Sequence, residues 1–276
     1  MKKLMKVLLS SMLMLSLTAC GSSGSDVEKQ ELTFESTELF DTDKCKMTVT
    51  SMEYDDDFVC NVELENKTSS CEEMFSVDYA TINGYKIDPL FATTVAAEAK
   101  SNDKITFSSS DLEEAGIVDV TDIKLHIRVY DNDEWTDFHE ETYTLYPLGE
   151  DKSTTYTRES TDDDQVLIDE QDVKVIATKK DPDGFWGYTV TLYLENNTKK
   201  NLMFSADDFN VDGYSFTSMY ACSLEAGDKA YTDLYLSSSE MEEAGIEDVT
   251  SIKVPFTIYD ADTLSDELVN KTVEIK

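Results

Sequence analysis

The feature that most constrains this chain is an internal duplication. The segment Ser108 to Asp131 returns as Ser237 to Asp260, and the two are identical at roughly 15 of 24 positions. The match extends toward the N-terminus, where Leu64 to Thr68 corresponds to Leu194 to Thr198. The period of about 129 residues is the size of a domain and far longer than a solenoid repeat. The sequence therefore predicts two tandem copies of one domain.

Within each copy, apolar and polar residues alternate. Cys45 to Val49, Val173 to Ala177 and Val190 to Leu194 place an apolar side chain at every second position, which is typical of half-buried strands. About seven short strands per copy, separated by turn residues, predict an all-β fold of two tandem β-sandwiches. Further strands are expected at Phe75 to Ile82, Lys104 to Ser108, Ile123 to Tyr130 and Thr142 to Tyr146.

One segment in each copy interrupts the strand pattern. Ser110 to Gly116 has the pattern of a capping box, with a serine that can cap a helix and an acid three residues on that can reach back, and a glycine that can end the helix in the left-handed region. The segment recurs as Ser239 to Gly245. We therefore expect one short capped helical turn in each domain.

The N-terminus has the features of an export signal. Lys2, Lys3 and Lys6 precede an apolar run that is far shorter than the roughly 20 residues of a membrane span. The run ends in Leu17-Thr18-Ala19-Cys20, which resembles the lipobox of bacterial lipoproteins. That resemblance implies cleavage before Cys20 and attachment of a diacylglycerol to its thiol. Several acyl chains hold a protein durably on a bilayer.

The chain divides into five predicted parts. Residues 1–19 form the signal peptide, and 20–32 form a flexible tether that begins with the Gly/Ser-rich string after the cysteine. The first sandwich is expected over 33–148 and the second over 166–276. The polar stretch 149–165 is the predicted linker.

The charge of the chain restricts its partners. It contains 58 Asp and Glu against 23 Lys and Arg, a formal net charge of −35, while hydrophobic residues make up 40% and are sufficient for folded cores. Nucleic acid is therefore not expected as a partner, and membrane contact is expected only through the lipid on Cys20. Two acidic runs, 55–57 and 162–164, have no twin in the other copy and are expected only to repel.

Nothing in the sequence predicts catalysis. The two histidines, His126 and His139, have no counterparts in the second copy, and His126 lies in a predicted strand. The serine triplets at 108–110 and 237–239 are explained by capping and are not surrounded by a nucleophile elbow. We find no nucleotide-binding or metalloprotease motif. The chain is therefore expected not to be an enzyme and to need no cofactor.

A calcium site has to be weighed at two equivalent positions. Asp131 with Asp133, and Asp260 with Asp262, follow the same strand in the two copies, and closely spaced carboxylates suit calcium. Neither pair continues into a complete calcium-binding loop, so solvated turn residues are the favoured interpretation. The sequence leaves calcium binding open.

Exposed aromatic residues are the other candidates for binding. Trp135, Trp186, Tyr85 and Tyr214 could stack on sugar rings or anchor a protein partner. Packing in the core or on a sheet is the favoured interpretation, and a shared turn explains the repeated Gly-Tyr pair.

The cysteines beyond Cys20 do not form a repeated framework. Cys45 and Cys60 correspond to Val173 and Val190 in the second copy, so buried free thiols are favoured. A disulfide between Cys45 and Cys60 is left open, since both face the same predicted core. The remaining two are Cys71 and Cys222.

Four short strings of the second copy are Phe185 to Thr189, Met203 to Ser205, Val211 to Tyr214 and Glu242 to Ile246. Together they resemble a repeated domain of uncharacterised lipoproteins of Firmicutes. The resemblance implies an immunoglobulin-like sandwich on a lipid anchor outside the cell. The first copy departs from the pattern, with Phe58-Val59-Cys60 in place of Trp-Gly-Tyr, so an aromatic site need not be shared by both domains.

These features predict a non-enzymatic protein anchored by lipid to the extracellular face of the cell membrane. Its expected role is to bind a protein partner or an envelope polymer as an adhesion or binding module. The alternative is a lipoprotein that binds a carbohydrate or a calcium-dependent ligand. The sequence does not identify the partner or the oligomeric state.

Overall fold

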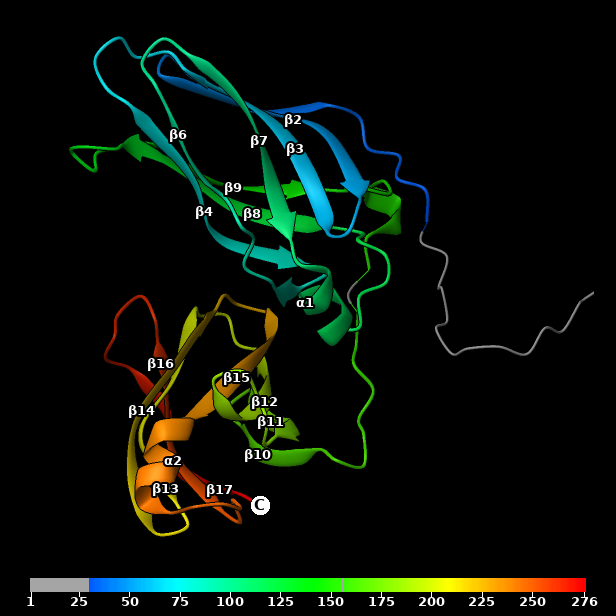
Figure 1. The fold of residues 1–276 in the computed structure, drawn as a ribbon. Coiled ribbons are helices and arrows are strands. Elements are labelled where there is room, and N and C mark those ends of the chain that lie inside the picture. The colour runs from blue at the N-terminus through cyan, green and yellow to red at the C-terminus, as the bar shows by residue number, and fades with distance from the viewer. Residues whose placement is uncertain (1–29, 155) are drawn as a thin grey trace, which may run out of the picture.

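The computed structural model describes residues 30–154 and 156–276, which form two β-sandwiches one after the other (Figure 1). The predicted all-β class, with two tandem immunoglobulin-like sandwiches and one short helix in each, is confirmed. No helix among these residues is long and apolar enough to cross a membrane. The predicted leader, Cys20 and most of the tether lie outside the described residues.

The first domain packs two antiparallel layers against each other. One layer has the order β1-β2-β3-β7, and the other contains β4, β5, β6, β8 and β9, with β4 paired to β5, β6 and β8. The strands are β1 (Thr37–Asp41), β2 (Cys45–Tyr54), β3 (Phe58–Asn66), β4 (Glu73–Ile82), β5 (Tyr85–Lys86), β6 (Ala92–Val95), β7 (Lys100–Phe107), β8 (Ile123–Asp131) and β9 (Asp137–Leu145).

The second domain repeats this arrangement with the orders β10-β11-β12-β15 and β14-β13-β16-β17. A short 3-10 helix, η1 (Glu150–Lys152), lies between the two domains. The strands are β10 (Gln165–Glu170), β11 (Val173–Asp181), β12 (Gly187–Asn196), β13 (Leu202–Val211), β14 (Tyr214–Leu224), β15 (Lys229–Ser237), β16 (Ile252–Asp260) and β17 (Glu267–Ile275).

The alternating sequence pattern explains the two cores. In β2, Cys45, Met47 and Val49 are buried and the residues between them are not, as the period of two requires. β12 differs because its residues from Thr189 to Leu194 are all buried, so both of its faces are covered. One face packs in its own sandwich, and Tyr193 on the other joins the core cluster of the first domain.

Two buried asparagines close equivalent strand ends. The Asn196 amide donates to the carbonyls of Lys200, Leu224 and Glu225 at 2.8 to 3.0 Å, and the side chain is fully buried. Asn66 occupies the same place in the first domain. These amides satisfy loop carbonyls that would otherwise be buried without a donor.

The two helices begin earlier than predicted and are capped differently. Helix α1 (Ser109–Glu114) follows Ser108, and α2 (Ser238–Ala244) follows Ser237, but neither serine makes a side-chain capping hydrogen bond. The capping box expected from Ser110 and Ser239 is therefore wrong, because each of these hydroxyls bonds the preceding cap serine instead. Gly116 and Gly245 do adopt the left-handed conformation, with φ of 70° and 68°.

A β-strand contact joins the two domains into one continuous sheet. β5 runs parallel to β15, with Tyr85 opposite Lys229, and the Lys229 N–H donates to the Gly84 carbonyl at 3.0 Å. In the second domain the residues that correspond to β5 and β6 form the single eleven-residue strand β14. In the first domain this strand breaks at residues 87–91, which contain Pro89.

A cluster of polar side chains beside this strand contact also connects the two domains. Lys124 Nζ lies 2.7 Å from Asp228 Oδ2 and 2.9 Å from Glu225 Oε2, and the Tyr79 hydroxyl donates to Asp228 Oδ2 at 2.9 Å. Lys124 and Tyr79 belong to the first domain, and both acids belong to the second. Since Asp228 is only 7% exposed, the pair is held in a low-dielectric environment.

The segment between the domains is also anchored. Arg158 makes two hydrogen bonds to Asp164, at 2.6 and 2.7 Å, and a third to the Tyr231 hydroxyl. The acidic run 162–164 therefore does more than repel, since Asp164 is the ion-pair partner of this arginine. Tyr231 in turn stacks on Tyr85 with ring centroids 6.1 Å apart.

Candidate ligand-binding cleft between the domains

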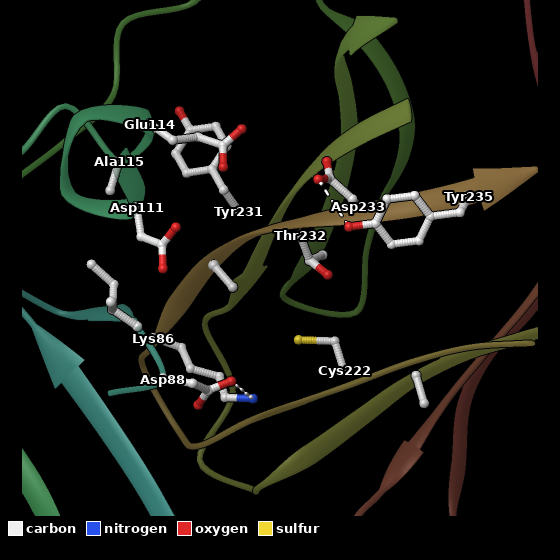
Figure 2. A pocket seen from close by; sticks show the side chains of 13 residues that line it. Lys86, Asp88, Asp111, Glu114, Ala115, Cys222, Tyr231, Thr232, Asp233 and Tyr235 are labelled. Carbon is white, nitrogen blue, oxygen red and sulfur yellow. Dashed lines mark hydrogen bonds and ion pairs between the residues drawn. The ribbon is translucent and has the colours of Figure 1, made fainter. Parts of the chain in front are cut away.

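Helix α1 carries two carboxylates to the boundary between the domains. Its first amide, Ser109 N–H, donates to Asp57 Oδ1 at 2.8 Å, so the acidic run 55–57 supplies the cap that the serines do not. This corrects the expectation that the run only repels. Leu112 buries the helix against the first domain and leaves Asp111 and Glu114 facing the second (Figure 2).

These carboxylates form one wall of a cleft of about 320 Å³. The opposite walls are strands β14 and β15, and the third side is the segment that follows β5 (Figure 2). Residues from both faces of β15, such as Thr232 and Asp233, line the same cleft. Because neighbouring residues of a strand point to opposite faces, the cleft must lie along the edge of β15. The other principal lining residues are Lys86, Asp88, Cys222, Ala230, Tyr231 and Tyr235.

The charge in the cleft is predominantly negative and mostly unpaired. Lys86 forms an ion pair with Asp88 at 3.3 Å. Within the described parts of the chain, Asp111, Glu114 and Asp233 have no ion-pair partner. Asp233 instead accepts hydrogen bonds from Thr191 and Tyr235.

Burial and the neighbouring carboxylates change the pKa values of two of these acids. Burial raises the pKa of Asp111 and of Glu114 above its ordinary value, and the negative charge of Asp233 raises each further. Burial is the main cause of both shifts, the neighbouring carboxylates add to them, and the charge of Lys179 opposes the rise at Glu114. A ligand with positive charge would reduce the repulsion between these carboxylates, whereas an anion would be repelled.

A second hollow of about 310 Å³ shares Glu114, Asp233 and Tyr235 with the cleft and extends it to an aromatic loop. On that loop Phe185 is 89% exposed and Trp186 is 68% exposed. Their rings meet edge to face, with centroids 4.8 Å apart. The rim of the cleft therefore presents aromatic surface to solvent.

Two glycines fix this loop. A side chain at Gly184 would meet Thr189 Oγ1 at 2.3 Å. Gly187 has φ of 124°, and a side chain there would approach the Leu236 carbonyl oxygen to 2.2 Å. The two glycines that flank Phe185 and Trp186 therefore allow the backbone of this loop to lie close to β12 and β15, where a side chain would not fit.

The calcium candidates have other roles. The Asp131 carboxylate accepts the N–H groups of Asp133 and Glu134 at 2.9 Å, and Asp260 accepts those of Asp262 and Thr263. Lys200 also pairs with Asp260 at 2.8 Å. Asp131 and Asp260 are buried, which corrects the favoured interpretation of solvated residues for these two, whereas Asp133 and Asp262 are exposed as expected.

The Asp131 and Asp260 carboxylates close hairpin turns. Throughout residues 30–154 and 156–276, no group of three or more His, Cys, Asp or Glu side chains could hold a metal ion.

The aromatic candidates divide in a way that the sequence did not predict. Trp135, Trp186 and Tyr214 are 53% to 68% exposed, so core packing is wrong for these three. Tyr85 is fully buried in the domain contact. Of the four, Trp186 lies on the rim of the cleft, while Trp135 stacks on Tyr130 at the far end of the first domain.

The cysteine question is settled by the register of β2 and β3. Cys60 lies opposite Met52, seven residues along β2 from Cys45. This separation is on the order of 20 Å at about 3.3 Å per residue, whereas a disulfide needs Cα atoms within about 7 Å. Cys45 and Cys60 therefore cannot pair, and all four cysteines of the described residues are free. The lipidation candidate Cys20 lies outside those residues.

The histidines lie away from the cleft. The His126 Nε2 is 3.1 Å from Glu140 on the neighbouring strand β9, as expected for a strand residue. The His139 Nε2 is 2.7 Å from the Tyr143 hydroxyl, and its ring packs 4.0 Å from that of Phe40. The hydroxyl neighbours of the two rings among the described residues are Thr142, whose Oγ1 lies 3.3 Å from His126 Nδ1, and Tyr143 beside His139.

Sequence reasoning missed the acids of the cleft. Asp111 and Glu114 lie in the predicted helical turn but were given no role of their own, and Asp233 was not considered. A weak signal existed, because the second copy has Glu240 and Glu243 at the positions of Asp111 and Glu114. The repetition does not distinguish the two copies, because only the acids of α1 face the other domain.

Comparisons with known proteins give no functional assignment. A scan against protein-family models and a search of curated proteins found no match. Among solved structures, the chain is 12% identical, with a TM-score of 0.21, to a complex of a chaperone and a tip adhesion subunit from pili of Acinetobacter baumannii. That alignment covers 79% of this chain and 90% of the other.

A second solved structure is a deletion mutant of oxalate decarboxylase from Bacillus subtilis. It is 9% identical with a TM-score of 0.12, covering 89% of this chain and 76% of that one. Both scores are too low to support an argument about function.

Proposed function

We propose that this chain is a non-enzymatic, lipid-anchored extracellular protein that binds a positively charged partner in the cleft between its domains. The observation that carries the proposal is the set of unpaired carboxylates, Asp111, Glu114 and Asp233, around a hollow of about 320 Å³. Clefts lined by one sign of charge concentrate ligands of the opposite sign. The aromatic rim at Trp186 adds surface on which a ligand can pack.

The rigid domain contact supports a binding role. The walls of the cleft belong to different domains, and the β5–β15 pairing and the Lys124–Asp228 ion pair fix them relative to each other. A site that is held in place before binding loses less entropy when the ligand arrives.

The location rests on the leader. The lipobox-like string that ends at Cys20 supports export and lipidation, and the strongly acidic surface suits a protein held away from an anionic bilayer. Cells that express the chain with Cys20→Ala should fail to incorporate labelled fatty acid into it. Globomycin should block processing of the unaltered chain. Labelling of the Cys20→Ala variant would contradict the proposed anchor.

The ligand proposal is tested with a simple polyvalent cation. Spermine is titrated calorimetrically into the full chain and into a Glu114→Gln/Asp233→Asn double variant. The matched control is Asp207→Asn/Asp208→Asn, which removes the same charge from exposed positions of β13. We expect the cleft variant to bind roughly tenfold more weakly and the control to stay within about threefold. Equal effects of the two variants would show that only the overall charge matters.

A carbohydrate-binding role is the second candidate. The exposed Phe185–Trp186 pair favours it, because sugar rings stack on exposed aromatic faces. A glycan array probed with the full chain and with Trp186→Ala distinguishes it. Loss of a glycan signal in Trp186→Ala would support this role.

A further inference from the structure

We propose that the ligand of the cleft is an extended polypeptide segment of a partner protein, with Lys or Arg at alternate positions, which adds a strand to the open edge of β15. This inference rests on the proposed function because it uses the same cleft. It goes further by specifying the class of partner and the backbone groups that hold it.

The first argument is the unpaired edge of β15. All nine residues of the strand pair with β12 on one side. On the other side, in the part of the chain that the structure describes, β5 pairs with β15 only at Lys229. The strand continues to Ser237, and no further strand of residues 30–154 or 156–276 lies beside it on this edge.

The orientation of the backbone follows from that single contact. The Lys229 N–H points toward the first domain, where it donates to Gly84. Because alternate residues of a strand direct their N–H and C=O groups to the same side, those of Tyr231, Asp233 and Tyr235 point toward this edge as well. These three residues span about 13 Å, enough for a segment of roughly five residues.

The second argument is that this edge of β15 borders the cleft. The chain after β5 turns away at Ile87 and Asp88, which line the cleft across from β15. In the second domain the equivalent residues stay in one continuous strand, β14. The break in the first domain thus leaves the edge of β15 beyond Lys229 without a paired strand among the described residues, and an extended backbone is the shape that pairs with such an edge.

The third argument is the chemistry of the two faces. On the face toward α1, Asp233 projects from β15 and Asp111 and Glu114 project from the helix (Figure 2). On the other face lie the small residues Ala221 and Cys222 of β14. An added strand directs alternate side chains to these two faces, so Lys or Arg at every second position would meet the carboxylates.

Charge also decides between partners. A second copy of this chain would bring another net charge of −35 to an acidic cleft, and like charges oppose that association. A basic segment gains both the electrostatic attraction and the backbone hydrogen bonds. A compact cation gains only the first.

The experiment compares three synthetic heptapeptides with the sequence Thr-Lys-Val-Lys-Val-Lys-Thr. One is unmodified, one is N-methylated at the three lysines, and one is N-methylated at the residue after each lysine. The two methylated peptides have the same mass and charge. Because alternate residues of a strand direct their N–H groups to the same edge, methylation blocks the edge that faces β15 in one isomer and the opposite edge in the other. We expect the isomer blocked on the edge facing β15 to bind the full chain about tenfold more weakly than the other. Equal affinity of the two isomers would overturn strand addition.

Hydrogen exchange locates the bound peptide. The unmodified peptide should slow exchange of the backbone amides of Tyr231, Asp233 and Tyr235. Protection at another strand edge, or at none, would overturn the inference. If the peptides bind independently of their methylation and still respond to Glu114→Gln/Asp233→Asn, the strand mode fails and the proposed function stands. If neither peptides nor spermine respond to that variant, both fail.

Discussion

Replacing Glu73 with leucine should stabilise the protein and remove part of its pH dependence. Glu73 is fully buried at the start of β4, and neither carboxylate oxygen has a hydrogen-bond partner in the described structure. The residue at the same place in the second domain is Leu202, which is also fully buried. The first domain therefore carries an acid where its twin carries an apolar side chain.

The size of the effect follows from the titration of this acid. Burial raises the pKa of Glu73 from 4.5 to about 7, against an opposing effect of Lys44, and the charge of Asp131 raises it further. Below about pH 4.5 both folded and unfolded chains hold the proton, so ionisation carries no penalty. Between pH 4.5 and 7 only the unfolded chain releases it, and stability falls by up to roughly 3 kcal/mol as the pH rises. Above pH 7 the full penalty is present.

Urea denaturation at half-unit steps from pH 4.5 to 8 measures this effect. The free energy of unfolding of Glu73→Leu should exceed that of the unaltered chain by an amount that grows to about 2 to 3 kcal/mol at pH 8. Glu72→Leu, at the exposed neighbouring position, is the control and should leave the pH dependence unchanged. A difference between Glu73→Leu and the unaltered chain that does not vary with pH would refute the argument.

Three further substitutions test other contacts by thermal and urea denaturation. Lys124→Ala leaves Asp228 buried without its cation and should cost about 2 to 3 kcal/mol, whereas an unchanged stability would mean that the ion pair does not hold the domains together. Asn196→Ala removes the donor to three buried carbonyls and should cost roughly 2 kcal/mol, and a loss below about 0.5 kcal/mol would show that water replaces it. Gly187→Ala should lower the free energy of unfolding more than Gly213→Ala does. Both glycines have positive φ, but only a side chain at Gly187 would meet a backbone atom at 2.2 Å. Equal losses of stability would rule out this contact as the cause.

The strand pattern was predictable because it depends on local alternation. The segments around Met47, Val175 and Leu192 all lie in strands, since an apolar residue at every second position fits a sheet with one buried face. The helix starts were predicted less well. Ser110 has the right residue type for a cap, but Ser108 precedes it and Asp57, some fifty residues away, supplies the capping oxygen.

The candidate site was not predictable to the same degree. Asp131 and Asp260 were recognised as a recurring pair, but their burial and their bonds to turn amides depend on hairpin geometry. Asp111, Glu114 and Asp233 come from distant parts of the sequence. They become neighbours only when α1 of one domain is placed over β15 of the other.

The repeated Gly-Tyr pair, Gly84-Tyr85 and Gly213-Tyr214, separates what the sequence predicts from what it does not. By itself the sequence determined the duplication, the all-β class and the positions of most strands, since each depends on a short stretch of residues. It also predicted the lipid anchor at Cys20 and left that prediction to be tested. Only the tertiary structure decided that Tyr85 is buried while its twin Tyr214 is exposed. The physical reason is that Tyr85 meets the edge of β15 and Tyr214 meets solvent, a difference made by the second domain rather than by the residues beside either tyrosine.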